Sequence, residues 1–420
     1  FLPHICATKQ LNRYTLIYMT ENNIQTFLTA VHPYDLLHKY GSPLYIYSED
    51  ILRSRCREIK EMICSKHFRP QYSAKANTNI KLLQIIRSEG LAVDAMSPGE
   101  VLQENAAGYT KDEIMYCSNN MTDAEMRFAH DHSSLIIFDS LSQIDRYGAQ
   151  FTGENIGIRL NFGFGAGGHK NIITGGNTKF GISVDDLSKV DTVLKKHSLK
   201  LIALHQHIGS NFLDGTAYLN AADLLLTEAQ KYKDVRILDF GGGFGVPYHA
   251  EHPLDIKALG NALLSLIHAH ETQDHRTYEI RVEPGRYIAA ECGLLLGTVT
   301  DIKKNRGTTY LGTDLGFNVL MRPILYQAHH QLHAYSDSIE ECIYTVCGNI
   351  CESGDILASE VKLKQMHIGD ILAIENVGAY GFSMSSNYNS RLRPAEVLLM
   401  DGKDMLIRKR EDYSSLRQQI

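Results

Sequence analysis

One lysine is notable for its small neighbours. Lys75 ends a short apolar run in Tyr-Ser-Ala-Lys-Ala-Asn, between Ser73 and Ala76. A lysine at the rim of a fold usually keeps its ammonium group in water. A lysine that forms a Schiff base instead needs a partly desolvated amine with room beside it. The small neighbours leave that room, so Lys75 is a candidate nucleophile.

Two later segments could complete a cofactor site around this lysine. A glycine run follows the apolar run Ile237–Phe240 and consists of Gly241, Gly242 and Gly243. Glycines there let backbone N–H groups approach a phosphate, although a plain tight turn is as common. Glu283 ends another run and opens the motif Glu283, Pro284, Gly285 and Arg286. This carboxylate could keep the pyridine nitrogen of pyridoxal 5′-phosphate (PLP) protonated, or it could form an ordinary ion pair at a rim.

His207 and Ser210 follow the apolar run Leu201–His207 in His-Ile-Gly-Ser. His207 could stack on a cofactor ring or be an ordinary core histidine. His205 points to the same face of the predicted strand, because side chains alternate along a strand. No third ligand stands at a recognisable spacing, so the sequence predicts no metal site.

Other candidate residues lie in the last third of the chain. Cys351 and Glu352 begin the polar turn Cys-Glu-Ser-Gly-Asp, and Cys347 precedes them without a second cysteine pair that would indicate zinc. A cysteine in such a turn is better placed for proton transfer than for packing. Arg322 and Tyr326 are four residues apart, so on a helix they share a face and could clamp a carboxylate.

The elements that must position these residues are eight apolar runs with helical patterns between most of them. The runs are Gln71–Lys75, Leu91–Ala95, Ile114–Cys117, Leu135–Phe138, Ile156–Leu160, Leu201–His207, Ile237–Phe240 and Ile280–Glu283. They predict an α/β fold, a TIM-type (β/α)₈ barrel over residues 44–287, whose strand ends bring the candidate residues to one mouth. An open doubly wound sheet is the alternative. It is disfavoured because no Gly-x-Gly-x-x-Gly follows the first run.

After about residue 288 the pattern changes to strand-like segments separated by turns. We assign residues 288–420 to a mainly antiparallel β domain and expect residues 19–43 to join it. Residues 1–18 are interpreted as a tag or upstream segment, because Met19 would make a natural start.

Composition excludes several classes of protein. With 44% hydrophobic and 21% charged residues, the chain is an ordinary globular protein. A net charge of −6 without a dense basic cluster argues against nucleic acid as a partner. No apolar run approaches the roughly 20 residues that cross a membrane. Eight irregularly spaced cysteines without a secretion signal indicate reduced thiols and a cytoplasmic protein.

Together these segments, from about Tyr34 to Arg408, resemble the diaminopimelate decarboxylase family of alanine-racemase-like (fold type III) PLP enzymes. Gly-Ala-Tyr-Gly, around Tyr380, with the Ser-Met-Ser-Ser-Asn-Tyr-Asn-Ser that follows, resembles the family's C-terminal signature. The resemblance implies PLP as the cofactor. The implied cofactor-binding residues are Lys75, His207, Ser210, Gly241, Gly242, Gly243, Glu283, Pro284, Gly285, Arg286 and Tyr380.

Cys-Glu-Ser-Gly-Asp is the most discriminating match. The resemblance implies two catalytic residues, Lys75 as the cofactor's attachment point and Cys351 as the proton donor. It also implies that Cys351 reaches the active site from the partner subunit of a homodimer with shared sites. The implied substrate-binding residues are Arg286, Arg322, Tyr326, Glu352 and Tyr380, with Glu352 on the distal ammonium group.

The expected activity is decarboxylation of meso-2,6-diaminopimelate to L-lysine and CO₂, the last step of lysine biosynthesis. The alternative is a decarboxylase of the same fold that acts on ornithine, lysine or carboxynorspermidine. An amino-acid racemase is less favoured, because Cys351 stands where the second catalytic base would be. A catalytically inactive regulatory homologue is also less favoured, because such a protein should have lost Lys75, Cys351 or the phosphate glycines.

Overall fold

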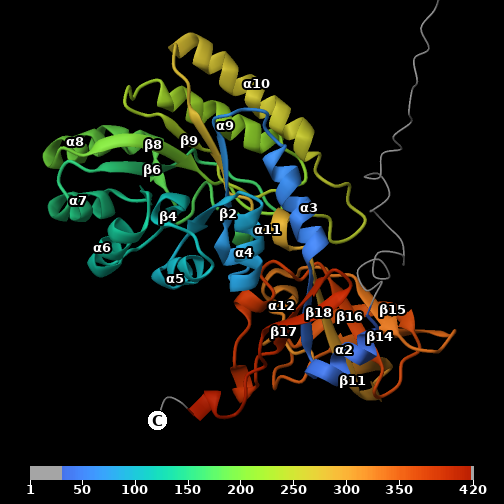
Figure 1. The fold of residues 1–420 in the computed structure, drawn as a ribbon. Helices are drawn as coiled ribbons and strands as arrows, with labels where there is room; N and C mark the ends of the chain where they lie inside the picture. Colours follow the sequence, from blue (N-terminus) through green and yellow to red (C-terminus); the bar gives the residue numbers. More distant parts are fainter. Residues whose placement is uncertain (1–30, 418–420) are drawn as a thin grey trace, which may run out of the picture.

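The computed structural model describes residues 31–417. The expected upstream segment 1–18 lies outside the described residues, as do residues 19–30 of the expected start of the β domain. The described chain forms two lobes, a larger α/β lobe and a smaller β-rich lobe (Figure 1). No helix among the described residues is long and apolar enough to cross a membrane.

The larger lobe is a closed barrel of eight parallel strands, each overlapping one of the eight predicted runs. The strands are β2 (Phe68–Ser73), β3 (Ala92–Ala95), β4 (Ile114–Ser118), β5 (Leu135–Phe138), β6 (Asn155–Asn161), β8 (Lys200–Gln206), β9 (Ile237–Asp239) and β10 (Glu279–Val282). Pairing of β5 with β6 and of β10 with β2 closes the ring. The short β7 (Ile182–Ser183) pairs only with β6. The predicted TIM-type barrel is therefore confirmed.

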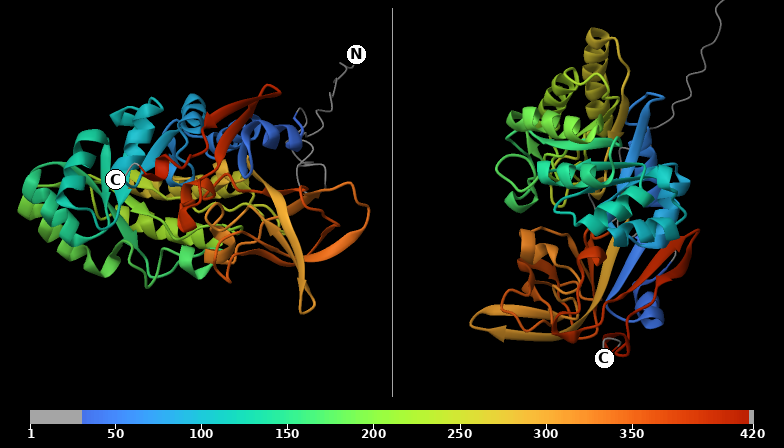
Figure 2. Two further views of the ribbon diagram at one scale, coloured as in Figure 1. Left: turned by 90° about the horizontal axis from the view of Figure 1, so that it is seen from below. Right: turned by 90° about the vertical axis from the view of Figure 1, so that its left-hand side faces the viewer.

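Helices surround the barrel on the outside (Figures 1 and 2). They are α3 (Glu49–Lys60), α4 (Ile80–Ser88), α5 (Pro98–Ala106), α6 (Asp123–His132), α7 (Leu141–Gln150), α8 (Leu187–His197), α9 (Thr216–Ala229) and α10 (Ile256–Asp274). Local sequence fixes where several begin. The side chains of Ser97, Thr122 and Ser140 each accept a backbone N–H three residues later and so cap α5, α6 and α7.

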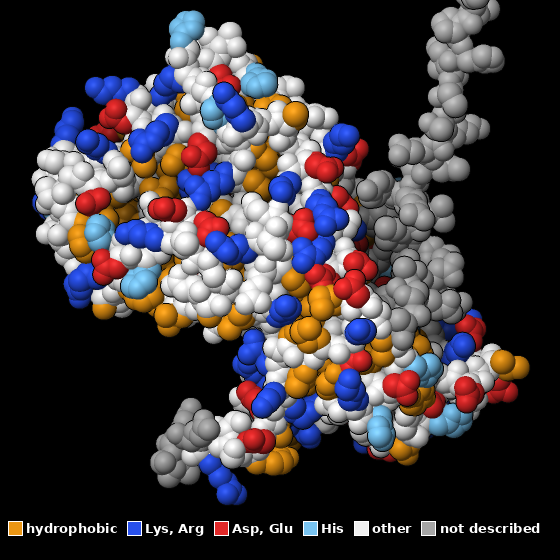
Figure 3. All heavy atoms as spheres, viewed as in Figure 1, with side chains coloured by type: hydrophobic (Ala, Val, Ile, Leu, Met, Phe, Trp, Pro, Cys, Tyr) orange, Lys and Arg blue, Asp and Glu red, His pale blue; other side chains and the backbone are white. Residues whose placement is uncertain are grey.

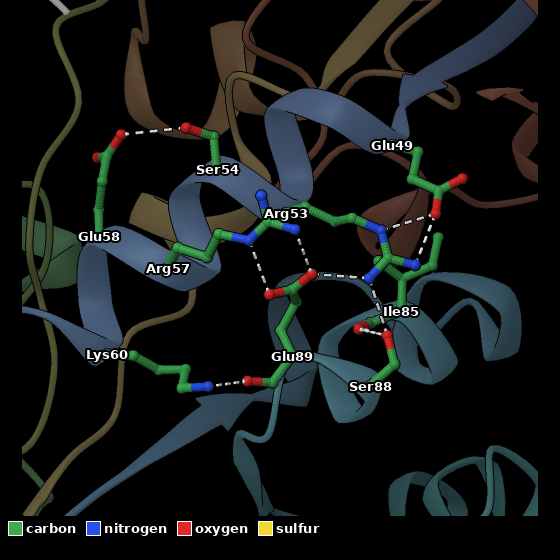
Figure 4. Close-up of polar contacts among 9 residues, drawn as sticks. All are labelled: Glu49, Arg53, Ser54, Arg57, Glu58, Lys60, Ile85, Ser88 and Glu89. Carbon is green, nitrogen blue, oxygen red and sulfur yellow. Dashed lines mark hydrogen bonds and ion pairs between the residues drawn. The ribbon is translucent and has the colours of Figure 1, made fainter. Parts of the chain in front are cut away.

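The first barrel helix is held against α4 by a surface network of charged groups (Figure 4). The Glu89 carboxylate, directly after α4, pairs with Arg53 at 2.7 Å and with Arg57 at 3.0 Å. Arg53 also pairs with Glu49, and Lys60 donates to the Glu89 carbonyl oxygen. The network therefore joins α3 to the C-terminal end of α4.

The smaller lobe contains a nine-stranded mixed sheet. Its strands are β1 (Leu44–Ser48), β11 (Gly293–Asn305), β12 (Thr308–Thr313), β13 (Leu332–Tyr335), β14 (Glu341–Cys347), β15 (Ile356–Lys364), β16 (Ile371–Glu375), β17 (Ala395–Met400) and β18 (Lys403–Arg408). Among the described residues, β1 with β17 and β12 with β14 are its parallel pairs, and the other pairs are antiparallel. The lobe also holds α2 (Pro33–Tyr40) and the short α12 (Arg322–Tyr326), while α11 (Arg286–Ala289) follows β10.

One segment lies in the smaller lobe, although its sequence predicts that it belongs to the barrel. Residues 44–48 are expected in the barrel, but β1 pairs with β11 and β17 in the mixed sheet. Leu44 and Ile46 pack into a cluster of that lobe, while Tyr45 and Tyr47 face the main core. A strand buried on both faces has the sequence pattern of a barrel strand, which explains the difference.

The molecular surface carries charges of both signs. On the face shown in Figure 3, Lys and Arg side chains are scattered over both lobes among Asp and Glu. No single basic region dominates this face, as a net charge of −6 suggests. An anionic ligand would therefore need a local positive site.

Candidate active site

A cavity of about 230 Å³ lies at the C-terminal ends of the barrel strands, facing the β domain. It brings together nine of the predicted site residues. They are Lys75, His207, Ser210, Gly243, Glu283, Gly285, Arg286, Tyr326 and Tyr380. The other six do not line it: Gly241, Gly242, Pro284, Arg322, Cys351 and Glu352. Both lobes contribute, because Tyr326 belongs to α12 and Tyr380 follows β16.

Lys75 lies in a 3₁₀ turn, Ala74–Ala76, because β2 ends at Ser73, two residues before the strand end that the sequence predicts. Its Nζ contacts Met96 Sδ at 3.2 Å. Burial lowers the pKa of Lys75, but the nearby negative charges of Asp94 and Glu283 raise it above its ordinary value overall. The free amine is therefore protonated and attracted to the carboxylates around it.

The β domain holds the Lys75 turn in place. The Ala76 carbonyl oxygen accepts hydrogen bonds from the Tyr380 N–H at 2.8 Å and from Ser383 Oγ at 3.1 Å. Asn77 Nδ2 donates to the Gly378 carbonyl oxygen at 3.0 Å. Tyr380 has a φ of 59°, a left-handed conformation that costs a non-glycine residue about 1–3 kcal/mol. Packing between the lobes therefore stabilises a strained backbone at the cavity wall.

Glu283 is a buried carboxylate with one oxygen unused. Its Oε2 lies 3.1 Å from His205 Nε2, whereas its Oε1 has no hydrogen-bond partner among the described residues. Burial alone would raise the pKa of Glu283, but His205 and the charge of Lys75 outweigh burial and lower that pKa to about 2. Glu283 is thus ionised and can accept a hydrogen bond from a cationic N–H in the cavity.

His207 lines the cavity as a neutral ring. Its Nδ1 accepts the Gly242 N–H at 3.2 Å, which leaves the proton on Nε2. Burial lowers the pKa of His207 well below its usual value, and the charges of Arg159 and Lys75 lower it further. A neutral imidazole with one edge fixed can pack flat against a ring without repelling a cation.

The glycine run allows the loops that follow β8, β9 and β10 to approach one another closely. A Cβ on Gly242 would lie 1.9 Å from the Glu283 carbonyl oxygen, and Gly243 has a φ of 103°. Gly243 lines the same cavity as Ser210, whose Oγ accepts from Arg286 Nη2 at 3.1 Å. This end of the cavity offers a hydroxyl, a guanidinium and backbone without side chains, a combination suited to phosphate.

Arg286 and Arg322 are buried guanidinium groups, 5% and 4% exposed. Among the described residues, neither pairs with a carboxylate. Tyr248 lies between them, with its hydroxyl accepting from Arg286 Nη1 at 2.9 Å and its ring centroid 4.4 Å from the Arg322 guanidinium carbon. Two buried cations without counter-ions are costly, so the site is built for an anionic ligand.

Cys351 and Glu352 are exposed in the loop between β14 and β15 and do not reach this cavity. The Cys351 N–H donates to Asn389 Oδ1 at 2.8 Å, and Glu352 Oε1 accepts from the Tyr388 hydroxyl at 2.6 Å. The Tyr388 ring stacks on Phe317, with centroids 5.6 Å apart. The loop is thus held in a defined position on the surface of the β domain.

Several lining residues lack a clear signal in the sequence. The cavity is also lined by Ser73, Met96, Arg159, Ile172, Thr174 and Phe180. Ile172, Thr174 and Phe180 come from the long loop after β6, which shows neither strand nor helix periodicity. Arg159 lies inside an apolar run that predicts only a strand.

One trio of described residues has the geometry of a metal site. Cys117, His205 and Glu283 each offer a ligand atom, and these atoms lie within 4.8 Å of one another. Burial raises the pKa of Cys117 well above its usual value, and the neighbouring carboxylates Glu283 and Asp94 raise it further. Two of the three groups, His205 and Glu283, are already hydrogen-bonded to each other at 3.1 Å.

Comparison with known proteins identifies the family. A family model described as "Pyridoxal-dependent decarboxylase, pyridoxal binding domain" matches residues 49–290. The chain is 37% identical over 395 residues to the diaminopimelate decarboxylase of Methanothermobacter thermautotrophicus, covering 91% of this chain and 92% of that protein. It is 35% identical over 390 residues to the enzyme of Thermoplasma acidophilum, covering 90% and 93%.

A solved structure agrees with this match. The diaminopimelate decarboxylase of Helicobacter pylori complexed with L-lysine superposes with a TM-score of 0.86 at 30% identity. The alignment covers 92% of this chain and 99% of that one. The whole two-lobed architecture, and not the barrel alone, is therefore shared.

The cavity fits PLP, the cofactor of this family. Lys75 offers an amine, and Glu283 Oε1 lacks the partner that a protonated pyridine nitrogen would supply. Ser210, Gly243 and Arg286 lie together where a phosphate could bind. The chain belongs to the diaminopimelate decarboxylase family of the pyridoxal-dependent decarboxylases.

Proposed function

We propose that this chain decarboxylates meso-2,6-diaminopimelate to L-lysine and CO₂ with PLP as cofactor, the last step of lysine biosynthesis. The observation that carries the proposal is the pair of buried guanidinium groups, Arg286 and Arg322, beside the Lys75 cavity. They suit a substrate that brings a second carboxylate. The Helicobacter pylori relative was crystallised with L-lysine, the product expected here.

The barrel residues hold the cofactor. Lys75 is its covalent attachment point, and the bound PLP supplies an electron sink for the charge left when CO₂ departs. Glu283, ionised and held by His205, keeps the pyridine nitrogen protonated. His207 packs against the ring. The phosphate end is formed by Ser210, Gly241, Gly242, Gly243, Pro284, Gly285, Arg286 and Tyr380.

Proton transfer to the product carbon is assigned to Cys351. Cys351 is exposed and does not line the cavity of its own chain, which supports its delivery by a second chain. We therefore propose a homodimer with shared active sites, in which Glu352 of the same loop binds the distal ammonium group. All seven cysteines among the described residues are free, which supports reduced thiols and a cytoplasmic location.

The distal carboxylate of the substrate is assigned to Arg286, Arg322 and Tyr326, with Tyr380 beside them. Lysine and ornithine, as substrates, would leave these guanidinium groups without a partner. Leaving a buried charge unpaired costs about 3–5 kcal/mol, or a few hundredfold or more in specificity. Specificity for diaminopimelate thus follows from desolvation of the arginines.

Steady-state kinetics test this function. The kcat/KM for meso-diaminopimelate should exceed those for D-lysine, L-lysine and ornithine by roughly a few hundredfold or more. Arg322→Ala should reduce this ratio of kcat/KM values, mainly by lowering kcat/KM for diaminopimelate. Comparable turnover of ornithine by the wild type would contradict the proposal and indicate a decarboxylase of another diamino acid.

A further inference from the structure

Arg322 is held by a residue that the mechanism above does not use. Its Nη1 donates to His330 Nε2 at 2.8 Å, and both side chains are 4% exposed. Arg322 Nε has no hydrogen-bond partner among the described residues. Some of the donors of this guanidinium are therefore fixed by protein, while at least one remains for a ligand.

The hydrogen bonds of His330 define its tautomer. Its Nδ1 lies 2.8 Å from the Glu375 carbonyl oxygen, which can only accept, so Nδ1 carries the proton. Its Nε2 then has the lone pair that accepts from Arg322. Burial lowers the pKa of His330 well below its ordinary value, and the charge of Arg322 lowers it further. His330 is thus a neutral acceptor held by a strand, β16, on the β-domain side.

Tyr248 restrains the same guanidinium from the barrel side. Its ring lies under Arg322 at 4.4 Å and meets the His330 ring edge-on at 5.1 Å. Its hydroxyl accepts from Arg286 Nη1. The pair of arginines is therefore spaced by one aromatic ring, and each lobe supplies one restraint on Arg322.

We propose that His330 and Tyr248 are positioning residues that determine substrate specificity, because they hold the Arg322 guanidinium where it binds the distal carboxylate. The inference rests on the proposed function in that this carboxylate is the one of diaminopimelate. It adds two residues that act through Arg322 and are not assigned to contact the substrate. A freely rotating Arg322 would lose much of its preference for a carboxylate, since ordering it would then oppose binding.

The test compares two inhibitors of the holoenzyme that differ in the distal carboxylate. L-Lysine keeps the distal carboxylate of the substrate, whereas 1,5-diaminopentane lacks it. His330→Leu removes the acceptor, so the dissociation constant of L-lysine, measured by calorimetric titration, should rise about 10- to 100-fold while that of 1,5-diaminopentane stays within about twofold. His330→Gln keeps an acceptor for Arg322 and should recover most of the loss. Tyr248→Leu removes the ring that lies under the Arg322 guanidinium and should weaken L-lysine about tenfold.

His329→Leu is the matched control, since His329 is the exposed neighbour whose ring meets His249. It should leave both constants unchanged. Equal weakening of both inhibitors, or no change in either, would overturn the inference for His330. If His330→Leu does not fold, the same comparison with Tyr248→Leu decides between these outcomes. A wild type that binds L-lysine more tightly than 1,5-diaminopentane but does not turn over diaminopimelate would instead refute the proposed function, because direct titration measures both dissociation constants without turnover.

Discussion

The exposed position of Cys351 leads to the sharpest prediction, which concerns two inactive variants. Lys75→Ala removes the proposed attachment point of the cofactor, and Cys351→Ala removes the proposed proton donor. Lys75 lines the barrel cavity, whereas Cys351 lies in the β domain and does not line it. If each site combines Lys75 from one chain with Cys351 from the other, the two defects can be separated by mixing subunits.

The size of the recovery follows from counting sites. Random reassortment of equal amounts gives about half mixed dimers. In each mixed dimer one site carries both substitutions and the other carries neither. Activity should therefore return to about a quarter of that of the same amount of wild type. A site built from one chain would give no such recovery, because every site would still carry one defect.

The assay is lysine formation after mixing, with subunit exchange followed by two affinity tags. The matched control mixes Lys75→Ala with Glu283→Ala. Both of these residues line one chain's cavity, so every site in the mixed dimers keeps one defect and no activity should return. Demonstrated exchange without recovery in the Lys75→Ala and Cys351→Ala mixture would refute the shared site.

Two further predictions concern single residues. Lys75→Ala should fold yet lose the visible absorbance of lysine-bound cofactor and essentially all turnover, and full activity would contradict its assigned role. Glu104 is buried, neither of its carboxylate oxygens has a hydrogen-bond partner among residues 31–417, and burial raises its pKa from 4.5 to about 8. Between these values the folded protein keeps a proton that the unfolded chain has lost, so the free energy of unfolding should fall with rising pH, by about 3–5 kcal/mol. Urea titrations at about pH 5 and pH 8 measure the free energy of unfolding at each pH, and Glu104→Gln should remove the difference between the two values. A difference as large as that of the wild type would refute this account.

Much of the fold could be predicted because the barrel strands are short apolar runs that are separated by helices and turns. Each of the eight predicted runs overlaps an observed strand, and the change of pattern near residue 288 coincides with the start of β11 at Gly293. The sequence signal failed at β1, which is buried on both faces like a barrel strand although it pairs in the other lobe. Which sheet such a strand joins depends on long-range pairing, which hydrophobic pattern does not encode.

The site residues also fall into two groups, those that sequence patterns predict and those that only long-range contacts reveal. Residues in motifs at strand ends, such as Glu283 and Ser210, could be predicted to converge because parallel strands end at one mouth. Tyr248 and His330 could not, since each lies in irregular structure and meets Arg322 only in the folded chain, Tyr248 through its ring and His330 through a hydrogen bond. A sequence pattern identifies residues that lie on the same helix or strand. Contacts between the two lobes can be identified only from the three-dimensional structure.

The contacts around Lys75 explain why the β domain is part of the catalytic unit and not an appendage. Ala76 accepts from Tyr380 and Ser383, and Asn77 donates to Gly378, all across the boundary between lobes. Without these partners, buried polar groups of the turn would be unsatisfied, at about 1–3 kcal/mol each. The backbone that carries Lys75 is therefore ordered by the same lobe that supplies Arg322, the residue proposed to bind the distal carboxylate. A barrel alone could present a lysine, but it would hold neither that lysine nor the distal carboxylate in a fixed place.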